Sequence, residues 1–159
     1  MTNSNYKLYY IFAFFIILLY QFSKYLVHFN FFEGERIPVL PFIDITLAYN
    51  KGAAWSFLSD AGGWQRWFFT LISSVVSFIL IVWIFRADPK DKITLIALCF
   101  ILGGAIGNLI DRILLGQVID FILVYYRHNY FPVFNVADIA ISLGAFLLII
   151  DTFLQSKKS

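Results

Sequence analysis

Four long apolar segments constrain this chain more than any other feature, because each is long enough to cross a membrane as a helix. They cover about residues 6–27, 67–85, 93–112 and 136–154, and a helix needs roughly 20 apolar residues to cross the hydrocarbon core of a bilayer. Hydrophobic residues make up 60% of the chain and charged residues only 14%. We therefore predict a membrane α-helical protein in which residues 1–159 form one domain with four transmembrane helices.

The basic residues predict how these helices are oriented. The connection at residues 86–92 and the tail at 155–159 are rich in lysine or arginine, and such segments usually stay in the cytoplasm. Both termini are then cytoplasmic, and the long loops at about 28–66 and 111–135 face the outside. No small-residue cleavage site follows the first segment, which favours a retained helix over a signal peptide. The net charge of +2 is too small and too dispersed to indicate a nucleic-acid partner.

The two outer loops carry patterns that are typical of strands. Apolar and polar residues alternate over 43–50, and the sequence Asn50-Lys51-Gly52 that follows is typical of a turn. In the second loop, residues 118–125 favour β-structure, and Pro132 favours extended backbone over 131–134. We expect a small outer sheet that rests on the four helices.

The third segment ends in polar residues. Gly103 and Gly107 have the spacing that lets helices approach closely in lipid, which indicates packing. Asn108, Asp111 and Arg112 follow at spacings of three and four, so they can share one helix face. One interpretation is an ion pair between Asp111 and Arg112 at the membrane surface. The other is that Arg112 and Asn108 hold a peptide backbone or a lipid head group.

Two further carboxylates are candidates for chemistry. Asp138 lies near the start of the fourth segment, three residues after Asn135, and this pattern also fits a simple capped helix start. Asp120 lies in an apolar run where nothing local would pair with it, so it needs a partner from elsewhere. If the two carboxyls meet, repulsion and desolvation would leave one proton shared between them, which is the chemistry of an aspartic protease.

Two other functions remain open on the residues alone. A small transporter or proton-conducting protein would use Asp120, Asp138 and Arg112 as a polar relay, and it would need polar residues that continue inward along several helices. A non-catalytic scaffold would assemble through the glycine face and would tolerate the loss of either aspartate. The aspartic mechanism requires no metal and no cofactor, and the single cysteine, Cys99, excludes a thiolate zinc cluster.

Four motifs, in order, resemble those of the bacterial lipoprotein signal peptidases, also called signal peptidase II. They are AYNKGAAWS at 48–56, GGAIGNLIDR at 103–112, VIDF at 118–121 and FNVAD at 134–138, and QFSK at 21–24 also matches. The resemblance covers nearly the whole chain. It implies four transmembrane helices, a small extracytoplasmic β-cradle, a short interfacial helix and a place in the bacterial inner membrane with the active site near the outer face.

The resemblance also implies an activity and a set of site residues. Members of the family are intramembrane aspartic endopeptidases that cut diacylglyceryl-modified prolipoproteins on the amino side of the lipobox cysteine, within the membrane lipid, and globomycin-type inhibitors block them. The implied catalytic pair is Asp120 and Asp138, and the implied substrate-binding residues are Asn50, Gly52, Asn108, Asp111, Arg112 and Asn135. The chain departs from the family pattern at Tyr20, where the family usually has aspartate, so Tyr20 must substitute by packing or through its hydroxyl.

Overall fold

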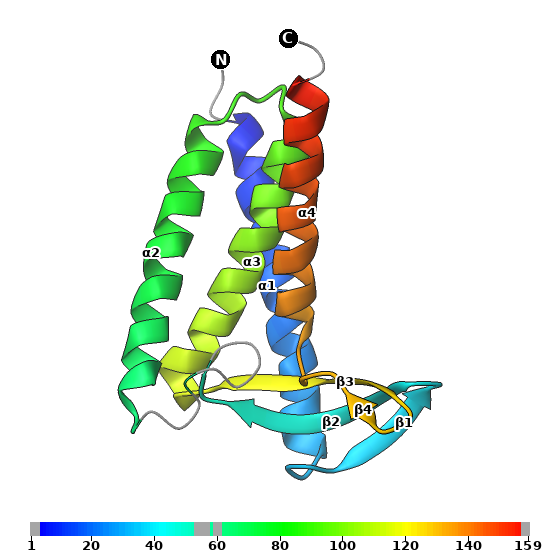
Figure 1. The fold of residues 1–159 in the computed structure, drawn as a ribbon. Helices are drawn as coiled ribbons and strands as arrows, with labels where there is room; N and C mark the ends of the chain where they lie inside the picture. The colour runs from blue at the N-terminus through cyan, green and yellow to red at the C-terminus, as the bar shows by residue number, and fades with distance from the viewer. Residues whose placement is uncertain (1–3, 53–57, 59–61, 157–159) are drawn as a thin grey trace.

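The computed structural model describes residues 4–52, 58 and 62–156, and Figure 1 shows four long helices with a sheet across one end of them. The helices are α1 (Ser4–Asn30), α2 (Trp64–Arg86), α3 (Lys92–Leu115) and α4 (Val136–Ser156). All four are long and apolar enough to cross a membrane, which confirms the four predicted spans. Each helix extends past its apolar segment, because the helical backbone continues into the polar residues at the interface.

Helix α3 lies at the centre of the bundle. Of its most apolar stretch, 56% is buried inside the protein, against 28% for α1, 17% for α2 and 22% for α4. The outer surfaces of the other helices expose large apolar side chains, such as Phe14, Phe78 and Phe153, which is the normal surface of a helix in lipid. Residues on α3 are therefore the ones that can meet side chains from all the other helices.

The glycines of α3 allow this close packing. A Cβ atom at Gly103 would lie 2.4 Å from a side-chain carbon of Ile16 on α1, and one at Gly104 would lie 2.5 Å from the carbonyl oxygen of Ala137 on α4. A Cβ atom at Gly107 would instead lie at an ordinary contact distance from the ring of Tyr20. The predicted packing role of the glycine face is confirmed, and it operates between helices of one chain.

The substitution Gly104→Ala should therefore loosen the α3–α4 contact. The added methyl group meets backbone, which cannot rotate away, and overpacking of this kind costs about 1–3 kcal/mol of folding free energy. We expect a lower midpoint of thermal unfolding in detergent. Gly107→Ala is the matched control, because its methyl group has room and alanine favours a helix. An equal effect of the two substitutions would contradict the packing account.

The sheet contains β1 (Arg36–Leu40), β2 (Ile43–Asn50), β3 (Val118–Tyr126) and β4 (Asn129–Tyr130), in the order β1-β2-β3-β4, with every pair antiparallel. The predicted strands at 43–50 and 118–125 are confirmed. The predicted extended segment at 131–134 is also confirmed, because Phe134 pairs with Ile122 beside the sheet.

The strands β1 and β4 were not predicted from the sequence. Pro38 lies within β1 and cannot donate a backbone hydrogen bond, so the segment resembles a loop. Proline is tolerated there because β1 is an edge strand that pairs only with β2. The two residues of β4 are too few to give a pattern.

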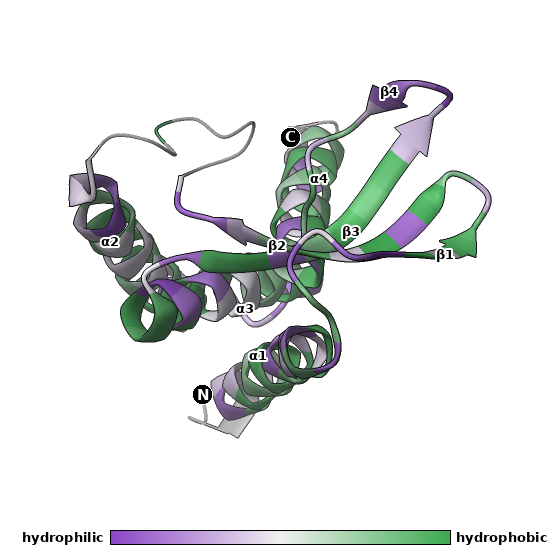
Figure 2. Cartoon of the chain, turned by 90° about the horizontal axis from the view of Figure 1, so that it is seen from below, coloured by the Kyte–Doolittle hydropathy of each residue, from purple (hydrophilic) through white to green (hydrophobic). Residues whose placement is uncertain are grey.

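One face of the sheet packs on the C-terminal end of α1. Val27 of α1 contacts Leu47, Ile119 and Phe121 of β2 and β3 in one apolar cluster, and Figure 2 shows the sheet crossing the ends of the helices. Among the described residues the helices are the four long ones, and the expected interfacial helix stays a prediction. Residues 53–56 of the AYNKGAAWS motif lie outside the described residues.

A buried ion pair joins α1 to α3 near the sheet. The Lys24 ammonium lies 2.8 Å from a carboxylate oxygen of Asp111, and the two side chains are only 1% and 3% exposed. Asp111 also accepts hydrogen bonds from the Gln21 side chain at 3.2 Å and from the backbone N–H of Ile119 at 3.1 Å. This one carboxylate therefore connects α1, α3 and the start of β3.

The substitution Lys24→Met should destabilise the protein, because it leaves the Asp111 carboxylate buried without its cation. Breaking one side of a buried pair typically costs about 3–5 kcal/mol. We expect a clearly lower unfolding midpoint in detergent, and partial recovery in Lys24→Met combined with Asp111→Asn, which removes the orphaned charge. A double variant that is less stable than the single one would contradict this interpretation.

Candidate active site

The C-terminal part of α3 directs two polar side chains toward the other elements. Asn108 is 7% exposed, and its carbonyl oxygen accepts hydrogen bonds from Lys24 Nζ at 2.7 Å and from Asn135 Nδ2 at 3.2 Å. Because both partners are donors, the side-chain amide of Asn108 must turn its oxygen toward them. The Nδ2 group of Asn108 therefore donates to Asp138 at 2.9 Å.

The ion pair between Asp111 and Arg112, one of the two interpretations of the sequence, is not formed. Adjacent residues of a helix point in different directions, so Asp111 faces Lys24 on α1, while Arg112 faces the loop after β2. Arg112 donates from Nη2 to the carbonyl oxygen of Gly52 at 3.2 Å, and its guanidinium lies over the ring of Phe69 at 5.4 Å from the centroid. This leaves Arg112 at the wall of a cleft.

Asn135 caps α4, as the sequence pattern predicted. Its side-chain oxygen accepts from the backbone N–H groups of Ala137 at 2.7 Å and Asp138 at 3.3 Å, and Asp138 accepts in return from the N–H of Asn135 at 3.0 Å. The cap also fixes the amide orientation of Asn135. Its Nδ2 group points away from α4 and donates to Asp120 at 2.7 Å.

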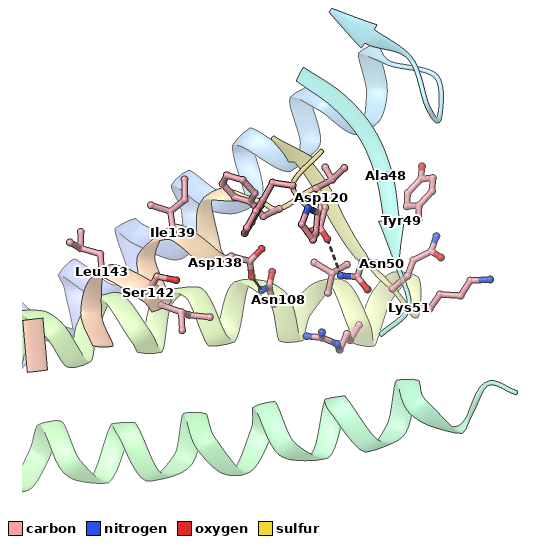
Figure 3. Close-up of a pocket in the computed structure, with 18 of the residues that line it drawn as sticks. Ala48, Tyr49, Asn50, Lys51, Asn108, Asp120, Asp138, Ile139, Ser142 and Leu143 are labelled. Atoms are coloured by element: carbon pink, nitrogen blue, oxygen red, sulfur yellow. Dashed lines mark hydrogen bonds between the residues drawn. The ribbon is translucent and has the colours of Figure 1, made fainter. Parts of the chain in front are cut away.

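Asp120 finds the partners that its apolar neighbours could not supply. It is 3% exposed, and its two oxygens accept from Asn135 and, at 3.0 Å, from Nδ2 of Asn50 (Figure 3). Burial and the nearby Asp138 carboxylate raise the pKa of Asp120 from 3.8 to about 6, while the amide hydrogen bonds act in the opposite direction. Asp120 can therefore carry a proton under mildly acidic conditions.

Asp120 and Asp138 line the same cleft, which has a volume of about 1320 Å³. Figure 3 shows the two carboxyls on β3 and α4, with Asn108 beside Asp138 and Asn50 beside Asp120. The cleft continues along α4 past apolar side chains, Ile139, Leu143 and Phe146. It thus joins a pair of acids to a surface that suits lipid or an apolar peptide.

The other sequence-predicted residues fall into two groups. Asn50, Asn108 and Arg112 line the cleft together with the aspartates. Gly52, Asp111 and Asn135 are buried and do not line it. Gly52 and Asn135 bond directly to lining residues, whereas Asp111 acts through Lys24, which donates to Asn108.

Lys24 is the residue that sequence reasoning did not assign a role. It connects Asp111 to Asn108 and so reaches Asp138 through one amide. The available signal was a lysine within an apolar segment, since such residues are costly in a membrane and usually have a function. Tyr20, one helical turn earlier, is 3% exposed and packs its ring against Gly107 and Ala137. Of the two roles expected for Tyr20, packing is the one for which the structure shows contacts.

Comparisons with known proteins agree with this geometry. The sequence profile of the family described as signal peptidase (SPase) II matches residues 12–154. A lipoprotein signal peptidase of Acinetobacter baumannii is 51% identical over 142 residues, which cover 89% of this chain and 81% of that protein. One from Cellvibrio japonicus is 51% identical over 162 residues, which cover 100% of this chain and 95% of that protein.

Two solved structures, each described as a bacterial membrane enzyme, share the fold. One superposes with a TM-score of 0.86 at 30% identity and covers 96% of this chain and 92% of that one. The other superposes with a TM-score of 0.78 at 32% identity and covers 91% of both chains. With the profile match and relatives that are half identical over most of their length, the chain belongs to the signal peptidase II family.

Proposed function

We propose that the chain is an aspartic endopeptidase of the bacterial inner membrane that removes signal peptides from diacylglyceryl-modified prolipoproteins, with Asp120 and Asp138 as its catalytic pair. The observation that carries the proposal is that these two carboxyls share one cleft and one hydrogen-bonding neighbour, Asn135. The family's relatives are named for the same activity. The bond cut is the one on the amino side of the lipid-modified cysteine.

The environments of the two aspartates support different roles in hydrolysis. Asp138 lies in the first turn of α4, where the helix dipole favours a negative charge. Asp120 is the buried member whose pKa is raised to about 6. In the proposed mechanism Asp138 is therefore the ionised base and Asp120 the protonated acid.

The proton transfers balance over the two halves of the reaction. Asp138 takes a proton from water as the water oxygen attacks the peptide carbonyl carbon, and Asp120 gives its proton to the carbonyl oxygen. When the carbon–nitrogen bond breaks, Asp138 protonates the departing amine and Asp120 recovers its proton from a hydroxyl of the intermediate. Both carboxyls thus return to their starting states.

The rest of the cleft suits an apolar peptide with lipid attached. Asn50 and Arg112 line the cleft and can bind backbone oxygens of an extended peptide, because amide and guanidinium groups are donors that match carbonyls. Gly52 holds both in place, since its N–H donates to Asn50 and its carbonyl accepts from Arg112. The apolar side chains along α4 suit the hydrophobic part of the substrate. We propose that globomycin-type cyclic peptides occupy the same cleft.

A relay function fits the described residues less well. The outer polar cluster around Lys24 and the carboxylate of Asp151 at the other end are separated by apolar side chains of α3, namely Leu95, Leu98 and Leu102. A transporter would require polar groups through this layer. We place the cleft on the outer side of the membrane with both termini in the cytoplasm, because the basic connection 86–92 lies at the opposite end from the sheet (Figure 1).

The substitutions Asp120→Asn and Asp138→Asn should each abolish cleavage, since each removes one of the two proton-transfer groups. General acid–base catalysis is typically worth about 10²–10⁴ in rate, so a prolipoprotein cleavage assay in detergent should show a loss of at least that size. Asp88→Asn, in the exposed α2–α3 connection, is the matched control and should be unaffected. Full activity in either site variant, with unchanged folding, would refute the aspartic mechanism.

The rate of cleavage should depend on pH as a bell-shaped curve. Activity requires a protonated Asp120, so it should fall as the pH rises through about 6, the raised pKa of that group. It should also fall in strong acid, because the attack of water requires one of the two carboxyls to be ionised. Single-turnover rates across the acidic and neutral range measure this directly, and a profile that stays flat from acid to neutral would contradict the assignment.

A further inference from the structure

The end of the sheet opposite Asn50 and Asp120 carries a cluster of exposed apolar and aromatic side chains, which we call the cradle tip. Its members lie on the β1–β2 hairpin and on β3 and β4, and each is more than half exposed: Val39, Leu40, Phe42, Tyr126 and Tyr130. The rings of Phe42 and Tyr126 pack against each other, with 5.6 Å between their centroids. In water such a cluster would promote aggregation, particularly beside an edge strand such as β1.

The turn at the cradle tip has an unusual sequence. Pro41 and Phe42 connect β1 to β2, and Phe42 has φ 71, in the left-handed region. Glycine or asparagine usually occupies such a position, because a bulky side chain makes it costly. Glycine would relieve the strain and would also remove an exposed ring. The choice of phenylalanine therefore indicates that the ring has a contact outside the protein.

The position of the cradle tip identifies what that contact is. Strand β3 begins three residues after α3 ends, and the chain enters α4 ten residues after β3 ends, so the sheet lies at the level where the helices leave the membrane. Figure 1 shows the tip at the height of the start of α4, and Figure 2 shows it projecting sideways beyond the four helices. A bilayer that surrounds the four helices would therefore meet the side of the tip from which the helices extend.

Two arginines complete a surface that matches phospholipid. The guanidinium of Arg36 lies 5.0 Å from the ring centroid of Tyr130, and that of Arg127 lies 5.3 Å from the ring of Tyr126. Exposed tyrosines and arginines are typical of the membrane interface, where rings sit among the head groups and cations meet phosphates. The apolar side chains of the tip therefore suit the acyl region of a bilayer, and its two arginines suit the head-group phosphates.

We propose that the cradle tip binds the outer leaflet of the membrane that the protein spans, with Phe42 and Leu40 in the acyl region and Arg36 and Arg127 on head-group phosphates. This contact would anchor the end of the sheet that does not pack on the helices. Strands β2 and β3 carry Asn50 and Asp120 at their other ends, so it would also fix the angle of the sheet over α4. The lipid contact itself does not depend on the proposed function.

Site-directed spin labelling in lipid nanodiscs tests the proposal, since the one native cysteine, Cys99, is buried. The measured quantity is the ratio of the nitroxide's collision rate with oxygen, which is soluble in lipid, to its collision rate with a water-soluble nickel chelate. This ratio should be several times higher for a nitroxide on Phe42→Cys than for one on Asp88→Cys. Phe78→Cys, on the exposed face of α2, gives the lipid reference value. The unsubstituted chain, treated with the same label, should remain unlabelled.

A second arm keeps the turn and removes the ring. In Phe42→Asn the left-handed conformation is preserved, because asparagine tolerates it, and a nitroxide on Leu40→Cys in this background should shift from the lipid value toward the Asp88 value. A water-like value at Phe42→Cys would overturn the proposal. Protection from both reagents, with spin–spin broadening between two copies, would overturn it in favour of a dimer contact.

Discussion

The ion pair between Lys24 and Asp111 is the interaction on which the rest of the site depends. It is buried at the junction of α1, α3 and the start of β3, where neither charge has access to bulk water. Lys24 also donates to Asn108, and this bond decides that the amide presents its nitrogen to Asp138. A single cation on α1 therefore determines the hydrogen bonding of a carboxylate on α4.

The same logic applies to the second half of the site. The cap of α4 uses the oxygen of Asn135, so its nitrogen is free to donate to Asp120. The capped helix start and the pairing of Asp138 with Asp120 in one cleft, which the sequence presented as alternatives for Asp138, thus occur together. Each of the four oxygens of the two aspartates accepts a hydrogen bond from a defined donor, so the pair is held in place before any substrate arrives.

The sequence predicted the parts of this protein whose cause is local. Apolar length predicts the four helices, alternation predicts β2 and β3, and the isolated Asp120 indicates a distant partner. Strand β1 was missed because Pro38 is compatible with a strand only at an edge, and edge position is a property of the assembled sheet. The role of Lys24 was missed because its partners lie 84 and 87 residues away on α3, at Asn108 and Asp111, and no local pattern reports such a contact. Tyr20 could be interpreted only once Gly107 was seen beneath its ring.

The central claim is that Asp120 carries the shared proton and Asp138 is ionised. Infrared difference spectroscopy of the resting enzyme at about pH 5, between the ordinary and the raised carboxyl pKa, measures this through the C=O absorption of protonated carboxylic acids. This absorption should lose one carboxyl component in Asp120→Asn and keep it in Asp138→Asn. Loss of the component in Asp138→Asn with its retention in Asp120→Asn would show that the acid and the base have been assigned the wrong way round.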